Sequence, residues 1–193
     1  MMTPTRRPPP TCAVAFKEWA GICDALGAGR QCVILRKGGI AEGPGGFAPE
    51  HDAFWLYPTR VHEAEQGLRD ADAPATPPAP AGRVDLRGLA VVTEVAYLDE
   101  PEGLPALAEF HVWSEATVRK RFEYRAPGLW VLGVRVFVRP GPWRIEETPA
   151  HAGCKSWVPL DAPLSTEGLA PALDDGSFAR QMDRLRSVLA PSP

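Results

Sequence analysis

Several signals of export, membrane insertion and metal binding are missing from the sequence. No apolar run approaches 18 residues, which excludes an obvious membrane-spanning helix. Arg6 and Arg7 are not followed by the apolar stretch that an export signal needs. Only four cysteines occur in 193 residues, and none of their spacings forms a C-x-x-C zinc or redox pair. We therefore expect a cytoplasmic protein with unpaired, buried thiols. The cysteines are Cys12, Cys23, Cys32 and Cys154.

An excess of positive charge is also missing. The chain has 21 Lys and Arg against 24 Asp and Glu, a net charge of −3, which excludes a histone-like basic binder. The glycine-rich stretches match neither a G-x-x-x-x-G-K-[ST] nor a G-x-G-x-x-G pattern, so no nucleotide cofactor is implied. In contrast, proline and glycine are abundant, at 22 and 18 residues, and concentrate in tails and loops. We expect a disordered Pro-rich tail over 1–12 and one α+β domain over 13–190, with a flexible Pro/Ala insertion at 70–82.

Hydrophobic spacing gives the expected order of elements. Apolar residues from Phe16 to Leu26 recur at helical intervals and predict a helix that ends at Gly27. Further helices are expected from a Thr59 cap through Leu68, over 115–124, and after a Ser177 cap. Strands are expected at 31–35, 53–57, 88–98, 129–138, 143–146 and 156–160. Because strands and long helices do not alternate strictly, we predict a mixed, strongly curved sheet with flanking helices, which could close into a small barrel.

Five short motifs follow one another along the chain: Phe16–Ala20, Leu35–Ile40, Glu50-His51, Phe54–Thr59 with His62, and Gly153–Val158. Their order and content resemble the bacterial domain of unknown function family 1802, over about residues 14 to 160. Glu63 departs from the pattern, where Gln would be expected. The resemblance implies a small bacterial cytosolic protein and no particular activity, and the overall plan is loosely similar to PUA-like barrels.

One set of polar residues flanks two expected strands and could gather at one end of the sheet. In an enzyme of the hydrolase type, with or without a metal, the catalytic groups would be Glu50, His51 and His62. Lys37 would hold an anion, with Glu42 and Thr59 beside it. The alternative is structural, because such residues also cap helices and bond turn amides.

A basic stretch near the middle of the chain suggests a different function. Between Ser114 and Arg125, four Lys and Arg stand against two Glu, with aromatic residues among them. Basic residues interleaved with aromatics suit nucleic acid or a nucleotide, and this is our primary hypothesis, with Arg119 and Arg121 on phosphate. The alternative is an ordinary amphipathic helix with a solvated basic face.

Two further hypotheses come from the late motif and the Pro-rich segments. Lys155, Ser156 and Trp157 are candidate ligand-binding residues, and Trp55 or Trp157 would line the pocket. Cys154 next to Lys155 could act as a nucleophile, although a buried thiol in a glycine turn explains the same residues. A protein-interaction module that docks through the tail or the 70–82 segment is the third hypothesis.

Overall fold

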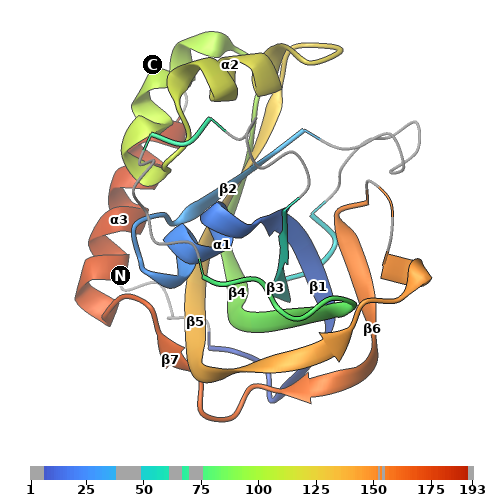
Figure 1. The fold of residues 1–193 in the computed structure, drawn as a ribbon. Helices are drawn as coiled ribbons and strands as arrows, with labels where there is room; N and C mark the ends of the chain where they lie inside the picture. Colours follow the sequence, from blue (N-terminus) through green and yellow to red (C-terminus); the bar gives the residue numbers. More distant parts are fainter. Residues whose placement is uncertain are drawn as a thin grey trace.

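A single mixed sheet organises the protein (Figure 1). The computed structural model describes residues 7–37, 49–60, 67–69, 76–151, 153 and 155–190. Within them the strand order is β2-β5-β4-β3-β1-β6, and β7 pairs with β5. The strands are β1 Thr11–Trp19, β2 Val33–Arg36, β3 Ala53–Thr59, β4 Arg83–Leu98, β5 Leu129–Glu146, β6 Trp157–Ser165 and β7 Ala170–Pro171. The helices are α1 Ala20–Gly27, α2 Glu115–Glu123 and α3 Asp175–Leu189, with short 3-10 helices η3 Pro101–Gly103, η4 Pro105–Phe110 and η5 Pro149–His151.

The sheet is open, so the expected strong curvature and barrel closure are wrong, whereas the α+β class and the mixed sheet are confirmed. Closure would need a backbone ladder between the edge strands β2 and β6. β2 has only four residues and pairs with β5 alone. The two edges meet instead through one side-chain hydrogen bond, in which Arg36 Nε donates to Ser156 Oγ at 2.9 Å.

The first helix begins later than its apolar spacing predicts. Residues from Phe16 to Trp19 belong to β1, and the helix starts at Ala20. Both Ala15 and Phe16 are fully buried, one in each of the two core clusters on opposite faces of the sheet. A strand buried on both faces shows no alternation, so its residues merge with the helical pattern that follows. β1 begins at Thr11, so the last two residues of the tail expected over 1–12 belong to this strand.

β4 and β5 form a long antiparallel pair that runs the height of the molecule in Figure 1. The separate strand expected at 143–146 is the end of β5, where Trp143 pairs with Leu86. Most other elements lie where the sequence predicts, including α2 with its Ser114 cap. For α3, however, the cap is Asp174, whose Oδ1 accepts from the Ser177 backbone N–H at 2.9 Å.

The helices cover one face of the sheet and bury the larger core cluster. The predicted apolar stripe of α3 packs there through Phe178, Met182 and Leu185. The smaller cluster, around Trp55, lies on the opposite face between β1, β3, β4, β5 and β6. Both faces of the central strands are therefore held in fixed positions, which makes their carboxyl ends a rigid platform.

Gly133→Ala tests how tightly α3 is seated on this sheet. A Cβ at Gly133 would lie 3.0 Å from Leu185 Cδ2 and 3.0 Å from Glu94 Cβ. We expect the overpacking to lower the free energy of unfolding by about 1–3 kcal/mol, measured by urea denaturation.

Gly141→Ala is the matched control, because a Cβ there meets no atom within 4 Å. Its effect should stay within about 0.5 kcal/mol. Equal effects of the two substitutions would contradict this packing.

Candidate functional site

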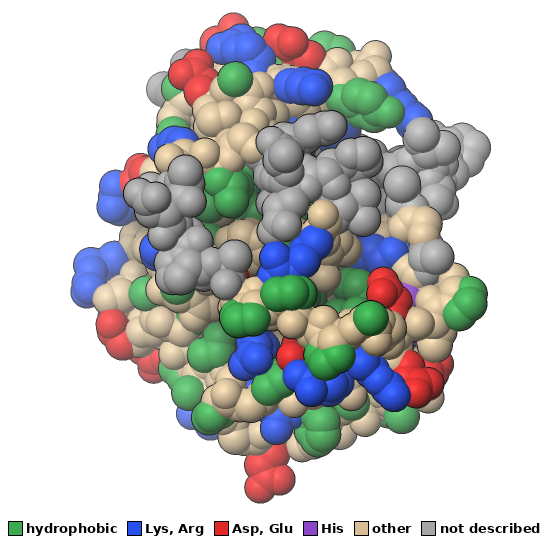
Figure 2. Space-filling model, viewed as in Figure 1, with side chains coloured by type: hydrophobic (Ala, Val, Ile, Leu, Met, Phe, Trp, Pro, Cys, Tyr) green, Lys and Arg blue, Asp and Glu red, His purple; other side chains and the backbone are tan. Residues whose placement is uncertain are grey.

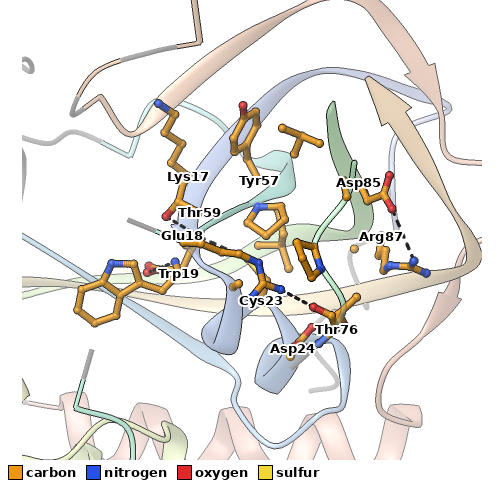
Figure 3. A pocket seen from close by; sticks show the side chains of 18 of the residues that line it. Lys17, Glu18, Trp19, Cys23, Asp24, Tyr57, Thr59, Thr76, Asp85 and Arg87 are labelled. Carbon is orange, nitrogen blue, oxygen red and sulfur yellow. Dashed lines mark hydrogen bonds and ion pairs between the residues drawn. The ribbon is translucent and has the colours of Figure 1, made fainter. Parts of the chain in front are cut away.

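The carboxyl ends of β1 and β3 lie side by side because these two strands are parallel. Lys17 is opposite Tyr57, and Trp19 is opposite Thr59. Figure 3 shows Glu18 and Thr59 between the Lys17 and Trp19 side chains. In open sheets containing parallel strands, ligands bind outside such carboxyl ends. This edge is therefore the first place to look for a site.

A cleft of about 1330 Å³ opens at this edge. Its walls come from α1, α2, the loop before β6, and the start of β4 with the segment that precedes it. That segment is the described part of the predicted 70–82 insertion. It is attached to α1 because Thr76 N donates to Asp24 Oδ2 at 2.6 Å, and the Thr76 hydroxyl bonds the same carboxylate.

The cleft is strongly basic, although the chain as a whole is acidic. Among the described residues, eleven Lys and Arg line it against four Asp and Glu, while the chain carries a net charge of −3. Figure 2 shows many of the Lys and Arg side chains on this side of the molecule gathered in its lower half. The cationic lining residues are Lys17, Arg30, Arg36, Lys37, Arg60, Arg83, Arg87, Lys120, Arg121, Arg139 and Lys155.

Two of these lysines shape the cleft by bonding backbone carbonyls. Lys37 Nζ donates to Phe122 O at 2.8 Å, to Gly128 O at 2.6 Å and to Ala126 O, so it closes the carboxyl end of α2. Partial burial lowers the pKa of Lys37 below its ordinary value. Lys17 Nζ donates to the carbonyls of His151 and Gly153. The predicted anion-binding Lys37 therefore has three acceptors from the protein itself.

Arg119 and Arg121, both predicted to bind phosphate, have different surroundings. Arg121 lines the cleft, but its guanidinium lies between the rings of Trp19 and Trp113, at 4.8 and 4.7 Å, and donates to a β2 carbonyl. Burial lowers the pKa of Arg121, while the Glu18 carboxylate acts in the opposite sense. Arg119 is exposed, lies 3.7 Å from Glu115, and is outside the cleft lining.

Three other cations of the lining have fewer protein partners. Arg87 Nη2 lies 3.7 Å from Asp85 Oδ2, and in the described part of the chain the buried Arg87 Nε and Arg139 Nε and Nη1 atoms have no hydrogen-bond partner. The Arg139 guanidinium stacks on Trp143 at 4.2 Å, which orients it. Lys120 is exposed on α2 and lines the cleft. These groups stand on β4, β5 and α2.

The polar set predicted to meet at one end of the sheet is divided in the structure. Glu50 and His51 precede β3 and Thr59 ends it, and a strand of this length spans about 20 Å. The His51 ring packs 4.8 Å from Trp157, and Thr59 Oγ1 donates to the Glu18 carbonyl at 3.2 Å. Glu42 and His62 lie outside the described residues. A catalytic role for Glu50, His51 and His62 stays a prediction.

The late motif contributes mainly to packing. Ser156 is buried and accepts from Arg36, and Trp157 lies 4.8 Å from Phe16, so neither lines the cleft. Trp55 is fully buried, which makes the expected pocket role wrong for this residue. Lys155 lines the cleft and donates to the Ala150 carbonyl.

The thiols and metal-binding side chains give no reactive centre in the described residues. Burial raises the pKa of the Cys12, Cys23 and Cys32 thiols, for Cys32 to about 12, which favours inert thiols. Cys154 lies outside the described residues. No group of three or more His, Cys, Asp and Glu that could hold a metal occurs in the described ranges.

Sequence reasoning missed Lys17 and Glu18, which occupy the centre of the site. Both lie within the helix that apolar spacing predicts from Phe16 to Leu26. The signal that could have located them is the end of an apolar strand at Trp19, since polar residues at strand ends are placed at the edge of a sheet.

Comparison with protein families gives a direct match. The model of DUF1802, a domain of unknown function, matches residues 15–184. The chain belongs to the DUF1802 family. The expected resemblance is confirmed, and the DUF1802 match also extends past the residues that carried it, into α3.

The chain was also compared with solved structures and with curated proteins. Crystal structures of an ASCH protein from Zymomonas mobilis are similar, at 15% identity. A mutant form has a TM-score of 0.48 over 76% of this chain and 88% of that chain, at 15% identity. The form without a stated mutation has a TM-score of 0.45 over 92% and 95%, also at 15% identity. No curated protein matches the DUF1802 chain. Among the described helices, none is both long and apolar enough to cross a membrane.

His111 makes the stability of the fold depend on pH. Its ring lies 5.6 Å from that of Trp113, one of the two indoles that flank the Arg121 guanidinium. Burial, followed by the charges of Arg69 and Arg121, lowers the pKa of His111 to about 4. Below pH 6.5 His111 binds a proton in the unfolded chain but stays neutral in the folded chain. The contribution of neutral His111 to the free energy of unfolding is therefore fully present above pH 6.5 and is lost as the pH falls toward 4. We expect His111 to account for a loss of about 2–3 kcal/mol between pH 7 and 4.5, measured by urea unfolding.

The His111→Leu variant isolates this contribution, because it removes the titrating group from the same buried place. Its free energy of unfolding should fall less steeply than that of the wild type over the same pH range. Parallel pH profiles would show that His111 does not cause the loss.

Proposed function

We propose that the chain binds single-stranded nucleic acid in the basic cleft. The observation that supports this most strongly is that eleven cationic and four acidic residues line the cleft in the described part of a chain of net charge −3. A protein that is negative overall repels a polyanion except where positive charge is concentrated. The walls of a cleft focus that potential, so this is where an anionic strand would bind.

The size of the cleft favours a polymer over a small metabolite. Its volume of about 1330 Å³ exceeds the roughly 300–1,000 Å³ of most small-molecule pockets. Trp19, Tyr57 and Tyr124 are among its lining residues. Stacking of a base on an aromatic ring contributes about 1–3 kcal/mol and needs bases free of a duplex, which favours a single strand.

The cations divide into those that shape the cleft and those that would bind phosphate. Lys17, Lys37 and Arg121 are engaged with backbone carbonyls. Arg87 and Arg139 keep unpartnered N–H groups within the described structure, and Lys120 is solvated. Guanidinium and ammonium groups with free donors form charge-assisted hydrogen bonds with phosphate, so these residues would supply most of the affinity.

The double variant Arg87→Gln with Lys120→Gln tests this assignment. We expect its affinity for a fluorescein-labelled single-stranded oligonucleotide to fall about tenfold or more, and the slope of log K against log salt to shrink by about two. Fluorescence anisotropy over a salt series measures both quantities.

Arg119→Gln is the matched control, because this neighbour on α2 is also exposed but lies outside the cleft. It should bind almost as tightly as the wild type. Binding that is equally weak in the control and in the double variant would place the ligand elsewhere, and failure of the wild type to bind any oligonucleotide would overturn the proposed function.

A further inference from the structure

Glu18 is a buried carboxylate with an unused acceptor in the centre of the cleft. Glu18 as a whole is 2% exposed, and it lines the cleft. Oε1 accepts from the Trp19 backbone N–H at 2.9 Å, whereas Oε2 is buried and has no hydrogen-bond partner among the described residues. Leaving a buried acceptor unpaired is costly, and such groups in native proteins call for an explanation.

The neighbouring polar groups do not relieve this acceptor. The Thr59 hydroxyl, labelled beside Glu18 in Figure 3, donates to the backbone carbonyl of Glu18 and not to its carboxylate. The charge of Glu18 acts on Arg121, but Arg121 Nη1 donates its hydrogen bond to the Leu35 carbonyl at 2.9 Å. The side chain is therefore held in place at one oxygen, while the other oxygen is buried and unpaired within the described residues.

The charges around Glu18 limit what it can receive. A cationic ligand group would be repelled by the eleven Lys and Arg of the lining. A phosphate would be repelled by the carboxylate itself. A neutral N–H donor is repelled neither by the cationic lining nor by the carboxylate. A single-stranded nucleic acid carries such donors on its bases.

We propose that Glu18 recognises a guanine base of the bound strand, an inference that rests on the proposed nucleic-acid function. Guanine presents an imino and an amino N–H side by side, which matches the two oxygens of a carboxylate. Oε1 retains a second lone-pair direction beyond its bond to Trp19 N–H, so both oxygens can accept. Uracil offers its single imino N–H between two carbonyls, and adenine and cytosine place a ring acceptor beside their amino group, so a carboxylate fits each of them less well.

The first test uses the wild-type protein and a short oligouridine with one variable central base. Anisotropy titrations compare guanine, adenine, cytosine, uracil and hypoxanthine at that position. We expect guanine to bind about tenfold tighter than uracil, as for one good bidentate base contact. Hypoxanthine lacks the amino group of guanine, so its strand should bind only slightly more tightly than the uracil strand. Equal binding of all five strands overturns the guanine assignment and leaves the proposed function standing.

The second test uses Glu18→Gln. The glutamine oxygen can still accept from Trp19 N–H, but an amide NH₂ replaces the free oxygen and opposes the donors of guanine. The ratio of guanine to uracil affinity should fall close to one, and an unchanged ratio overturns the inference. Circular dichroism and the midpoint of thermal unfolding establish that the variant is folded, and the hypoxanthine comparison stands without any variant.

Glu147→Gln is the matched control. It makes the same substitution at an exposed carboxylate of the same cleft, whose Oε1 lies 3.4 Å from the Tyr57 hydroxyl. Removing this negative charge should strengthen the binding of every strand alike and leave the guanine preference intact. Loss of the preference here as well would show that charge, and not base recognition, sets it.

Discussion

The parallel pairing of β1 with β3 is the constraint on which the site depends. Each strand pairs antiparallel with its other neighbour, and these two run in the same direction. Their carboxyl ends therefore reach the same edge of the sheet, and Lys17, Glu18 and Trp19 lie against the end of β3. Core clusters on both faces of the sheet keep this register fixed, since a slip of one residue would exchange its two buried faces.

The cations of the cleft have two roles, because some hold its walls in place and others are available to a ligand. Several cations of the cleft are held by carbonyl oxygens or aromatic rings, so they form part of its walls and carry positive potential into it without being mobile. Such preorganised charge costs little rearrangement when a ligand arrives. The net charge of −3 limits nonspecific attachment of polyanions elsewhere on the protein.

Local patterns predicted most elements, because apolar residues at helical spacing directly indicate one buried face, as in α3. These patterns failed at β1, because a strand buried on both faces shows no alternation. They also failed to predict that the sheet stays open, since closure into a barrel depends on the length of β2. The site was harder to predict. The basic character of α2 was visible, but whether Arg119 or Lys120 faces the cleft depends on how the helix packs. Glu18 was missed because its importance arises from burial and from an unpaired oxygen, which are properties of the fold.

The Trp19–Arg121–Trp113 stack has an optical consequence. Trp19 lines the cleft, whereas Trp55 and Trp113 are almost fully buried. An indole at the cleft changes its emission when water is displaced from its surroundings, and a base stacked on it quenches that emission. The two buried indoles are shielded from water and should change less, whereas Trp130, Trp143 and Trp157 are half-buried and also contribute to the emission. The protein thus carries its own fluorescent reporter of occupancy, and ligands can be screened without a label on either partner.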